Sequence, residues 1–134
     1  TAHGPFDTHF NQPPMHTRLW GEVSGAITDF FDDLREHDAS DNVVMMIFTE
    51  FGRRVRDNGT GTDHGAGGGA FIIGDMVKGG MYGTYPSLAP EDLNQGDLDP
   101  NYDFRGFYSS VVDQWLGLDP VPIVGGKFEQ IQFV

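Results

Sequence analysis

The chain contains no cysteine, and it has no long apolar run. The missing cysteines exclude disulfide bonds, thiolate zinc sites and cysteine nucleophiles. A membrane-spanning helix needs about 18 or more consecutive apolar residues, so none is expected. No signal peptide is visible, and the chain opens on Thr1 rather than on methionine. We therefore expect a mature, processed or partial chain without a membrane span.

Basic residues are also scarce. The sequence has 8 Lys and Arg against 20 Asp and Glu, which gives a formal net charge of −12. Such a field repels nucleic acid and anionic membranes, whereas bound divalent cations would offset part of it. The 134 residues are 38% hydrophobic and 13% aromatic, which suffices for the core of one domain. We therefore expect a single domain over residues 1–134 and no nucleic-acid partner.

Two segments have the apolar spacing of amphipathic helices. The first begins near Leu19 and is expected to end near residues 37–40. The second follows Asp103, a residue type that caps helices, and is expected to stop at Gly117. The apolar positions are Leu19, Trp20, Val23, Ile27, Phe30, Phe31 and Leu34 in the first helix, and Phe104, Phe107, Tyr108, Val111, Val112, Trp115 and Leu116 in the second.

Two short apolar runs between these helices are predicted to be strands. Val43–Phe48 is typical of a fully buried parallel strand, and residues 70–73 of another short buried strand. The alternation of helices and strands predicts an α/β fold with a largely parallel sheet. The other segments are predicted to be a loop (52–69) with a turn at Asn58-Gly59, a turn or small hairpin (77–85), a polar excursion (86–102) and a terminal hairpin (121–134).

Asp7 and His9 are the first candidates for a metal site. Two residues apart on an extended segment, their side chains point to the same side and can share one cation. The alternative is that both make local hydrogen bonds in a loop. His3 and His16, which lie nearby in the sequence, are expected to be surface residues.

Glu50 and Arg53 follow the Val43–Phe48 run. A carboxylate at the end of a buried strand is costly unless it is paired or binds a metal, so Glu50 is either a metal ligand or the partner of Arg53 or Arg54. Arg53 either holds an anionic substrate or neutralises Glu50. Gly52 indicates a positive φ or a close backbone approach.

Asp63 and His64 stand in a glycine-rich stretch, Gly61-Thr62-Asp63-His64-Gly65. On a loop both side chains can face one site, or one can bind a metal while the other supports it. The alternative is a turn in which the aspartate caps the backbone. A calcium-stabilised loop over residues 91–103 fits less well, because its acids lack the regular spacing of an EF-hand.

Taken in order, these motifs resemble a bacterial family known as domain of unknown function 1501. That family is similar in turn to the alkaline phosphatase and sulfatase superfamily. The resemblance runs from about Pro5 to Phe128. It rests on Phe6-Asp7-Thr8-His9 with Asn11-Gln12, Phe48-Thr49-Glu50-Phe51-Gly52-Arg53, Gly61-Thr62-Asp63-His64-Gly65, Val77-Lys78-Gly79-Gly80 and Asp103-Phe104-Arg105.

The resemblance implies an α/β fold, the C-terminal portion of an alkaline-phosphatase-like, doubly wound and mostly parallel sheet with flanking helices. It implies a domain exported to the periplasm or cell surface, continued by the rest of its own polypeptide or by partner subunits. The superfamily nucleophile lies N-terminal to the first Asp-His segment, and the matching segment is absent from this sequence.

The resemblance also implies a divalent metal, zinc, calcium or magnesium, held by Asp7, His9 and His64. Glu50 and Asp63 are the further candidate ligands, but Phe51 stands where a second site would need a ligating side chain. Arg53 would stabilise negative charge on an anionic ester. The expected function is a metal-dependent phosphatase- or sulfatase-like hydrolase. The alternative is a non-catalytic, phosphatase-like structural or interaction module of an exported or cell-surface assembly.

Overall fold

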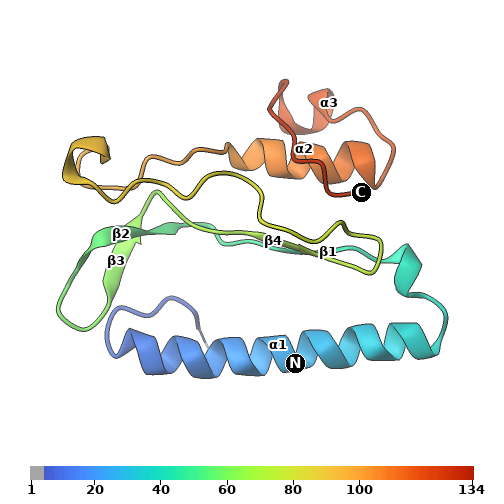
Figure 1. Ribbon diagram of the computed structural model, residues 1–134, viewed down its shortest axis with the longest axis horizontal. Coiled ribbons are helices and arrows are strands. Elements are labelled where there is room, and N and C mark those ends of the chain that lie inside the picture. Colours follow the sequence, from blue (N-terminus) through green and yellow to red (C-terminus); the bar gives the residue numbers. More distant parts are fainter. Residues whose placement is uncertain (1–4) are drawn as a thin grey trace.

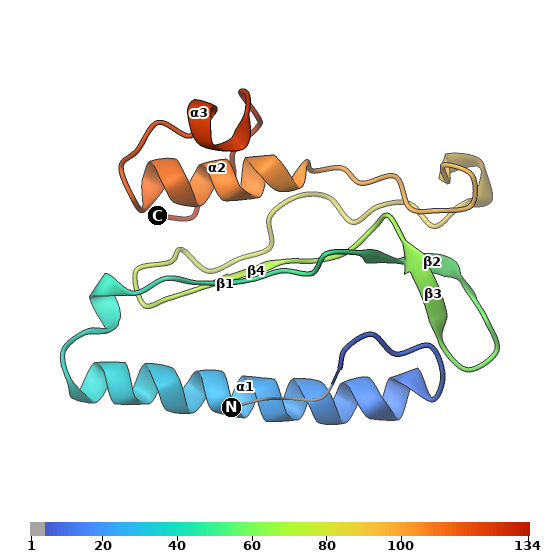
Figure 2. The same ribbon diagram turned by 180° about the vertical axis from the view of Figure 1, so that it is seen from behind.

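A computed structural model describes residues 5–134, and His3 lies outside this part of the chain. The described residues form three layers, in which a central layer of short strands separates two long helices (Figures 1 and 2). Helix α1, Gln12–Glu36, covers one side of the strands. Helix α2, Phe104–Gln114, covers the other side. The prediction of an α/β fold is confirmed at this level.

Helix α1 starts earlier than the apolar pattern predicts. Pro13 and Pro14 stand in its first turn, where a missing N–H costs nothing, so the helix begins at Gln12. Leu19 and Phe31 are buried at 1% and 3% exposure. Trp20 meets the ring of Phe71 edge to face, which joins the helix to the strand layer. The helix ends at Glu36 with His37 as its C-cap, as predicted.

The two apolar strands pair antiparallel, not parallel as predicted. Strand β1, Met45–Ile47, lies beside β4, Phe71–Ile73, with Met46 opposite Ile72. A parallel pair needs a crossover, usually a helix, whereas the segment between β1 and β4 folds into a second hairpin and returns. An apolar run alone does not distinguish these two cases.

The predicted loop at residues 52–69 is in fact mostly this second hairpin. Strand β2, Gly52–Asp57, pairs antiparallel with β3, Thr62–Gly65, and Arg53 lies opposite His64. The turn at Asn58-Gly59 is confirmed: the Asn58 side chain accepts hydrogen bonds from the backbone N–H groups of Thr60 and Gly61. The loop prediction failed because this hairpin is rich in charged and glycine residues and is only partly buried, so no hydrophobic alternation marks it.

Helix α2 begins after Asp103 as predicted, and it ends at Gln114, shortly before the predicted stop at Gly117. The Asp103 carboxylate accepts a hydrogen bond of 2.9 Å from the Arg105 backbone N–H, and Gly117 has a φ of +64° just beyond the helix. Ser109, Ser110 and Val111 face the interior. Before α2, Val77 N–H donates to Gly74 in a turn, and residues 86–102 contain the 3₁₀ turn η2, Pro90–Asp92.

The terminal segment is not the predicted hairpin. Residues Val121–Val124 form one helical turn, α3, and the described chain beyond it contains no strand. Its backbone pairs instead with side chains of α2. Ser110 accepts from the Ile131 N–H at 2.9 Å, and Gln114 accepts from the Phe133 N–H at 3.1 Å. Side-chain acceptors on α2 thus satisfy polar groups that a hairpin would have paired.

Asp75 joins the segment after β4 to the end of α1, and the effect of removing it should be visible at neutral pH and disappear in acid. Both Arg35 Nε and Nη2 donate to its carboxylate, which lowers the pKa of Asp75 to about 2. A carboxyl with a depressed folded-state pKa stabilises the fold above its unfolded pKa of 3.8 and loses this effect as pH falls towards 2.

We therefore expect Asp75→Asn to unfold at lower denaturant concentration than the wild type at pH 7, and at nearly the same concentration near pH 2. Urea titrations at pH 7, 4 and 2 measure the difference. The matched control is Asp29→Asn, an exposed aspartate on α1, the helix that carries Arg35, which should leave the unfolding midpoint unchanged at every pH. An equal gap between Asp75→Asn and wild type at all three pH values would contradict the assignment.

The small sheets leave apolar surface open. Among the described residues β1 and β4 pair only with each other, and Phe48 and Phe71 are 59% and 50% exposed. No described helix combines the length and the apolar character needed to span a bilayer.

Candidate metal centre

Asp7, His9 and His64 converge at one point of the surface. Asp7 and His9 lie on the loop that precedes α1, and His64 lies on β3. The Nε2 of His64 donates to Asp7 Oδ1 at 2.7 Å, and the Nδ1 of His9 lies 3.5 Å from the same oxygen. One ligand atom from each residue falls within 4.8 Å of the others. Residues far apart in the sequence thus present one oxygen and two nitrogens together.

This donor set fits a divalent cation. A tetrahedral zinc ion with ligands at about 2.0–2.1 Å needs about 3.3 Å between ligand atoms, and the distances of 2.7 and 3.5 Å from Asp7 Oδ1 to the two histidines lie on either side of this value. Three protein ligands would leave a fourth position for water or substrate. Because Asp7 and His64 are 53% and 43% exposed, an ion could enter from solvent. Binding would displace the proton that His64 now shares with Asp7.

The Asp7 carboxylate is already held in its charged form. The hydrogen bond from His64 is the main cause that lowers the pKa of Asp7, and the nearby His9 and Arg53 act in the same direction. Partial burial opposes the shift but does not outweigh it. Asp7 therefore offers a negative oxygen ligand over a wider pH range than an ordinary aspartate.

The loop that carries Asp7 and His9 is fixed through Thr8, which is only 5% exposed. The Gln12 amide donates to both the carbonyl and the hydroxyl oxygen of Thr8, at 3.0 and 3.1 Å. The Thr8 hydroxyl also lies 2.8 Å from His16 Nε2. His16 is thus half-buried beside the loop, and the prediction that it is a surface residue is wrong. Thr8 points inward, so its neighbours Asp7 and His9 point outward together.

A family comparison agrees with these motifs. A family model described as "Protein of unknown function (DUF1501)" matches residues 1–119. The chain belongs to the DUF1501 family. The resemblance inferred from the motifs is thereby confirmed for the family. Searches of curated proteins and of solved structures gave no match.

In this DUF1501 chain, the side chains of Asp63 and His64 have different partners. Both stand on strand β3, where successive side chains point to opposite faces. His64 faces Asp7, whereas Asp63 accepts a hydrogen bond from the Asn58 amide at 3.0 Å. Asn58 also donates to the His9 carbonyl, so Asp63 supports the loop indirectly. The partner of Asp63 is thus a side chain, and not the turn backbone of the alternative interpretation.

Glu50 is not part of the cluster in the described structure. Its carboxylate is exposed and accepts from the Thr49 hydroxyl at 3.3 Å. Neither expected arginine partner pairs with it: Arg54 lies 3.7 Å from Asp97, and Arg53 binds backbone carbonyls. The Glu50 metal role stays a prediction, and it would need another ligand from outside this cluster.

Phe51 forms a wall of the cluster. Its ring stacks on the His64 imidazole with centroids 3.7 Å apart and planes 14° apart. The neighbouring Gly52 approaches the backbone of Gly67 so closely that a Cβ there would overlap the Gly67 carbonyl. The close backbone approach expected at Gly52 is thus confirmed. Phe51 has no atom that can bind a metal, but its ring packs against the imidazole of His64 and so helps to orient it.

Arg53 is occupied by the backbone around the cluster. One of its terminal nitrogens, Nη1, donates to the carbonyls of Thr8 and Thr62 at 2.7 and 2.8 Å. Nη2 donates to the Phe6 carbonyl at 2.9 Å. Only the remaining N–H groups of Arg53 could therefore contact an anion. The anion-binding role of Arg53 stays a prediction.

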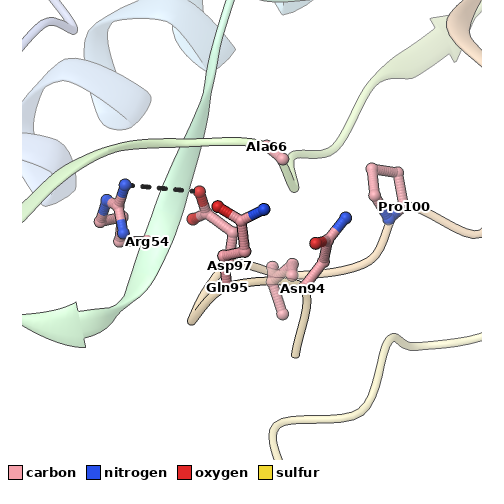
Figure 3. A pocket seen from close by; sticks show the side chains of 7 residues that line it. Arg54, Ala66, Asn94, Gln95, Asp97 and Pro100 are labelled. Carbon is pink, nitrogen blue, oxygen red and sulfur yellow. Dashed lines mark ion pairs between the residues drawn. The ribbon is translucent and has the colours of Figure 1, made fainter. Parts of the chain in front are cut away.

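A cavity of about 290 Å³ lies on the other face of β2 (Figure 3). Arg54 and Asp97 line it, together with Asn94, Gln95 and Pro100, and no residue of the Asp7 cluster does. One Asp97 oxygen, Oδ1, is buried without a hydrogen-bond partner among the described residues. Since solvent does not reach that oxygen, a ligand in the cavity would not reach it either. The cluster, and not this cavity, is the better candidate site.

Sequence reasoning missed the residues that hold the cluster in place: Thr8, Gln12, His16 and Asn58. In the sequence Gln12 stands out only as part of a family motif, and its spacing from Thr8 does not predict their hydrogen bonds. Contacts to backbone carbonyls carry little residue-type signal, since any residue offers that acceptor.

Proposed function

We propose that this chain is part of a metal-dependent hydrolase of phosphate or sulfate esters, with Asp7, His9 and His64 as ligands of a divalent cation. The observation that carries the proposal is the convergence of these three side chains from a loop and from β3. A bound cation would polarise an anionic ester and lower the pKa of bound water. Zinc, magnesium and calcium are the candidate ions, and the nitrogen ligands favour zinc.

The chain's own residues would have separate tasks. Asp7 supplies negative charge, and the two imidazoles bind as neutral ligands. The stacked Phe51 ring shields one side of His64, so a small anionic ester would have to approach from the exposed side.

The nucleophile would come from outside this chain, from the rest of its own polypeptide or from a partner subunit. We infer this from the family resemblance and from the unpaired outer edges of β1 and β4 in the described structure. Added strands would make the chain the C-terminal portion of a larger, doubly wound sheet and would cover Phe48 and Phe71. Export to the periplasm or cell surface belongs to the same proposal and rests on the resemblance.

A non-catalytic, phosphatase-like interaction module is the second candidate. Phe51 favours it, because an aromatic ring stands beside His64 where a second ligand is expected, and Glu50 lies outside the cluster. In that case a single metal would stabilise the fold without turning over an ester.

Elemental analysis and calorimetric titration of the full-length polypeptide test the proposal. We expect one bound divalent ion per chain, lost in the triple variant Asp7→Asn, His9→Gln, His64→Gln. An aryl phosphate and an aryl sulfate then separate the two candidates: turnover that disappears in the triple variant supports the hydrolase. Metal binding without turnover supports the module. No metal in the wild type would refute the hydrolase, because only the module allows a chain without a bound ion.

A further inference from the structure

We propose that Arg53 is a positioning residue that assembles the Asp7, His9 and His64 cluster, and not a residue that binds the anion. The inference rests on the proposed metal site. One guanidinium reaches three carbonyls that belong to the two halves of the cluster. Phe6 and Thr8 flank Asp7 on the loop, and Thr62 precedes His64 on β3.

The geometry explains why a single arginine serves this purpose. Arg53 lies directly opposite His64 across the β2–β3 pair, so its side chain starts beside the imidazole. The guanidinium then lies 5.3 Å over the Phe51 ring, which in turn stacks on His64. The planar fork satisfies acceptors on the loop and on the strand at once, which the ammonium of lysine does less well. Release of this contact would free the loop from β3.

Electrostatics and positioning predict opposite results when Arg53 is removed. The positive charge of Arg53 acts on Asp7, and a cation beside a metal site weakens metal binding by repulsion. If charge were its main influence, Arg53→Ala would bind zinc more tightly. If it holds the ligands in place, Arg53→Ala would bind zinc more weakly despite the lost repulsion.

We expect Arg53→Ala to weaken zinc binding by about 10–100-fold, the usual loss when a group supporting a metal ligand is removed. Arg53→Lys keeps the charge without the fork and should also bind more weakly than the wild type. Arg56→Ala, on the same strand and exposed, is the matched control and should bind like the wild type. Chelator competition with the full-length polypeptide measures all four affinities, and circular dichroism verifies that each variant is folded. Unchanged or tighter zinc binding in Arg53→Ala would overturn the proposal.

A second readout needs no metal. The His9 and His64 rings lie 4.8 Å apart, close enough for a nuclear Overhauser effect between their protons in histidine-labelled protein. We expect this signal in the wild type and in Arg56→Ala, and its loss in Arg53→Ala and Arg53→Lys. If it persists in folded Arg53→Ala, Arg53 does not position the cluster. Failure of the wild type to bind zinc would instead refute the proposed metal site, and the ring contact would still decide the role of Arg53.

Discussion

Replacing His64 with glutamine is expected to lower zinc affinity by more than a hundredfold. His64 is the member of the cluster that β3 contributes, and its loss leaves two ligands on one loop. Second-sphere changes cost about 10–100-fold, so loss of a ligand should exceed that range. Calorimetric titration of the wild type and of His64→Gln measures the difference.

The same experiment must separate lost affinity from lost stability. The Asp7–His64 pair is about half exposed, and exposed pairs contribute little to folding. The apo form of His64→Gln should therefore unfold at nearly the wild-type temperature. Zinc should raise the unfolding temperature of the wild type through mass action and leave that of His64→Gln nearly unchanged.

His37→Gln provides the matched control. His37 is exposed at the far end of α1 and contacts Asp33, so zinc binding should match the wild type. Affinity should also fall on acidification, because imidazole ligands must be free of their extra proton. The hydrogen bond from His64 lowers the pKa of Asp7, so this carboxylate stays charged to lower pH than an ordinary aspartate. Equal zinc affinity in His64→Gln and wild type would refute the proposed centre.

The helices were predictable from the sequence because their burial follows a regular period. Phe31 and Val111 recur on the inner faces that the spacing indicates, and Asp103 caps α2 through a local contact. The direction of strand pairing was not predictable in this way. It depends on whether the segment between β1 and β4 crosses over or turns back, and the exposed hairpin that turns back has no hydrophobic signal.

The candidate site also has a part that the sequence predicts and a part that it does not. Asp7, His9 and His64 could be named in advance because their residue types and order resemble a family motif. That Asp63 points away from this group became clear only from the structure, because both residues lie on a strand, where alternate residues face opposite sides. The contacts of Arg53 could not be predicted from the sequence, because its acceptors are backbone carbonyls and every residue type carries one.

Truncation of Phe133 is expected to produce the largest loss of stability among single changes. Its side chain is completely buried, and replacing a buried phenylalanine with alanine costs about 3–5 kcal/mol through lost burial and the remaining cavity. The backbone around it joins three parts of the fold. Its N–H donates to Gln114 on α2, and its carbonyl accepts from the Lys78 N–H at 2.6 Å.

The effect should be confined to stability. Figure 1 shows the C-terminal segment against α2, on the opposite side of the strand layer from α1 and the loop that carries Asp7. Folded Phe133→Ala should therefore bind zinc like the wild type at low temperature, yet unfold at much lower urea concentration. Val134→Ala, at the adjacent position that is 50% exposed, should change the unfolding free energy by less than about 1 kcal/mol. A Phe133→Ala loss as small as that would mean that the segment does not pack against α2 in solution, and that β1, β4 and α2 are held together by other contacts.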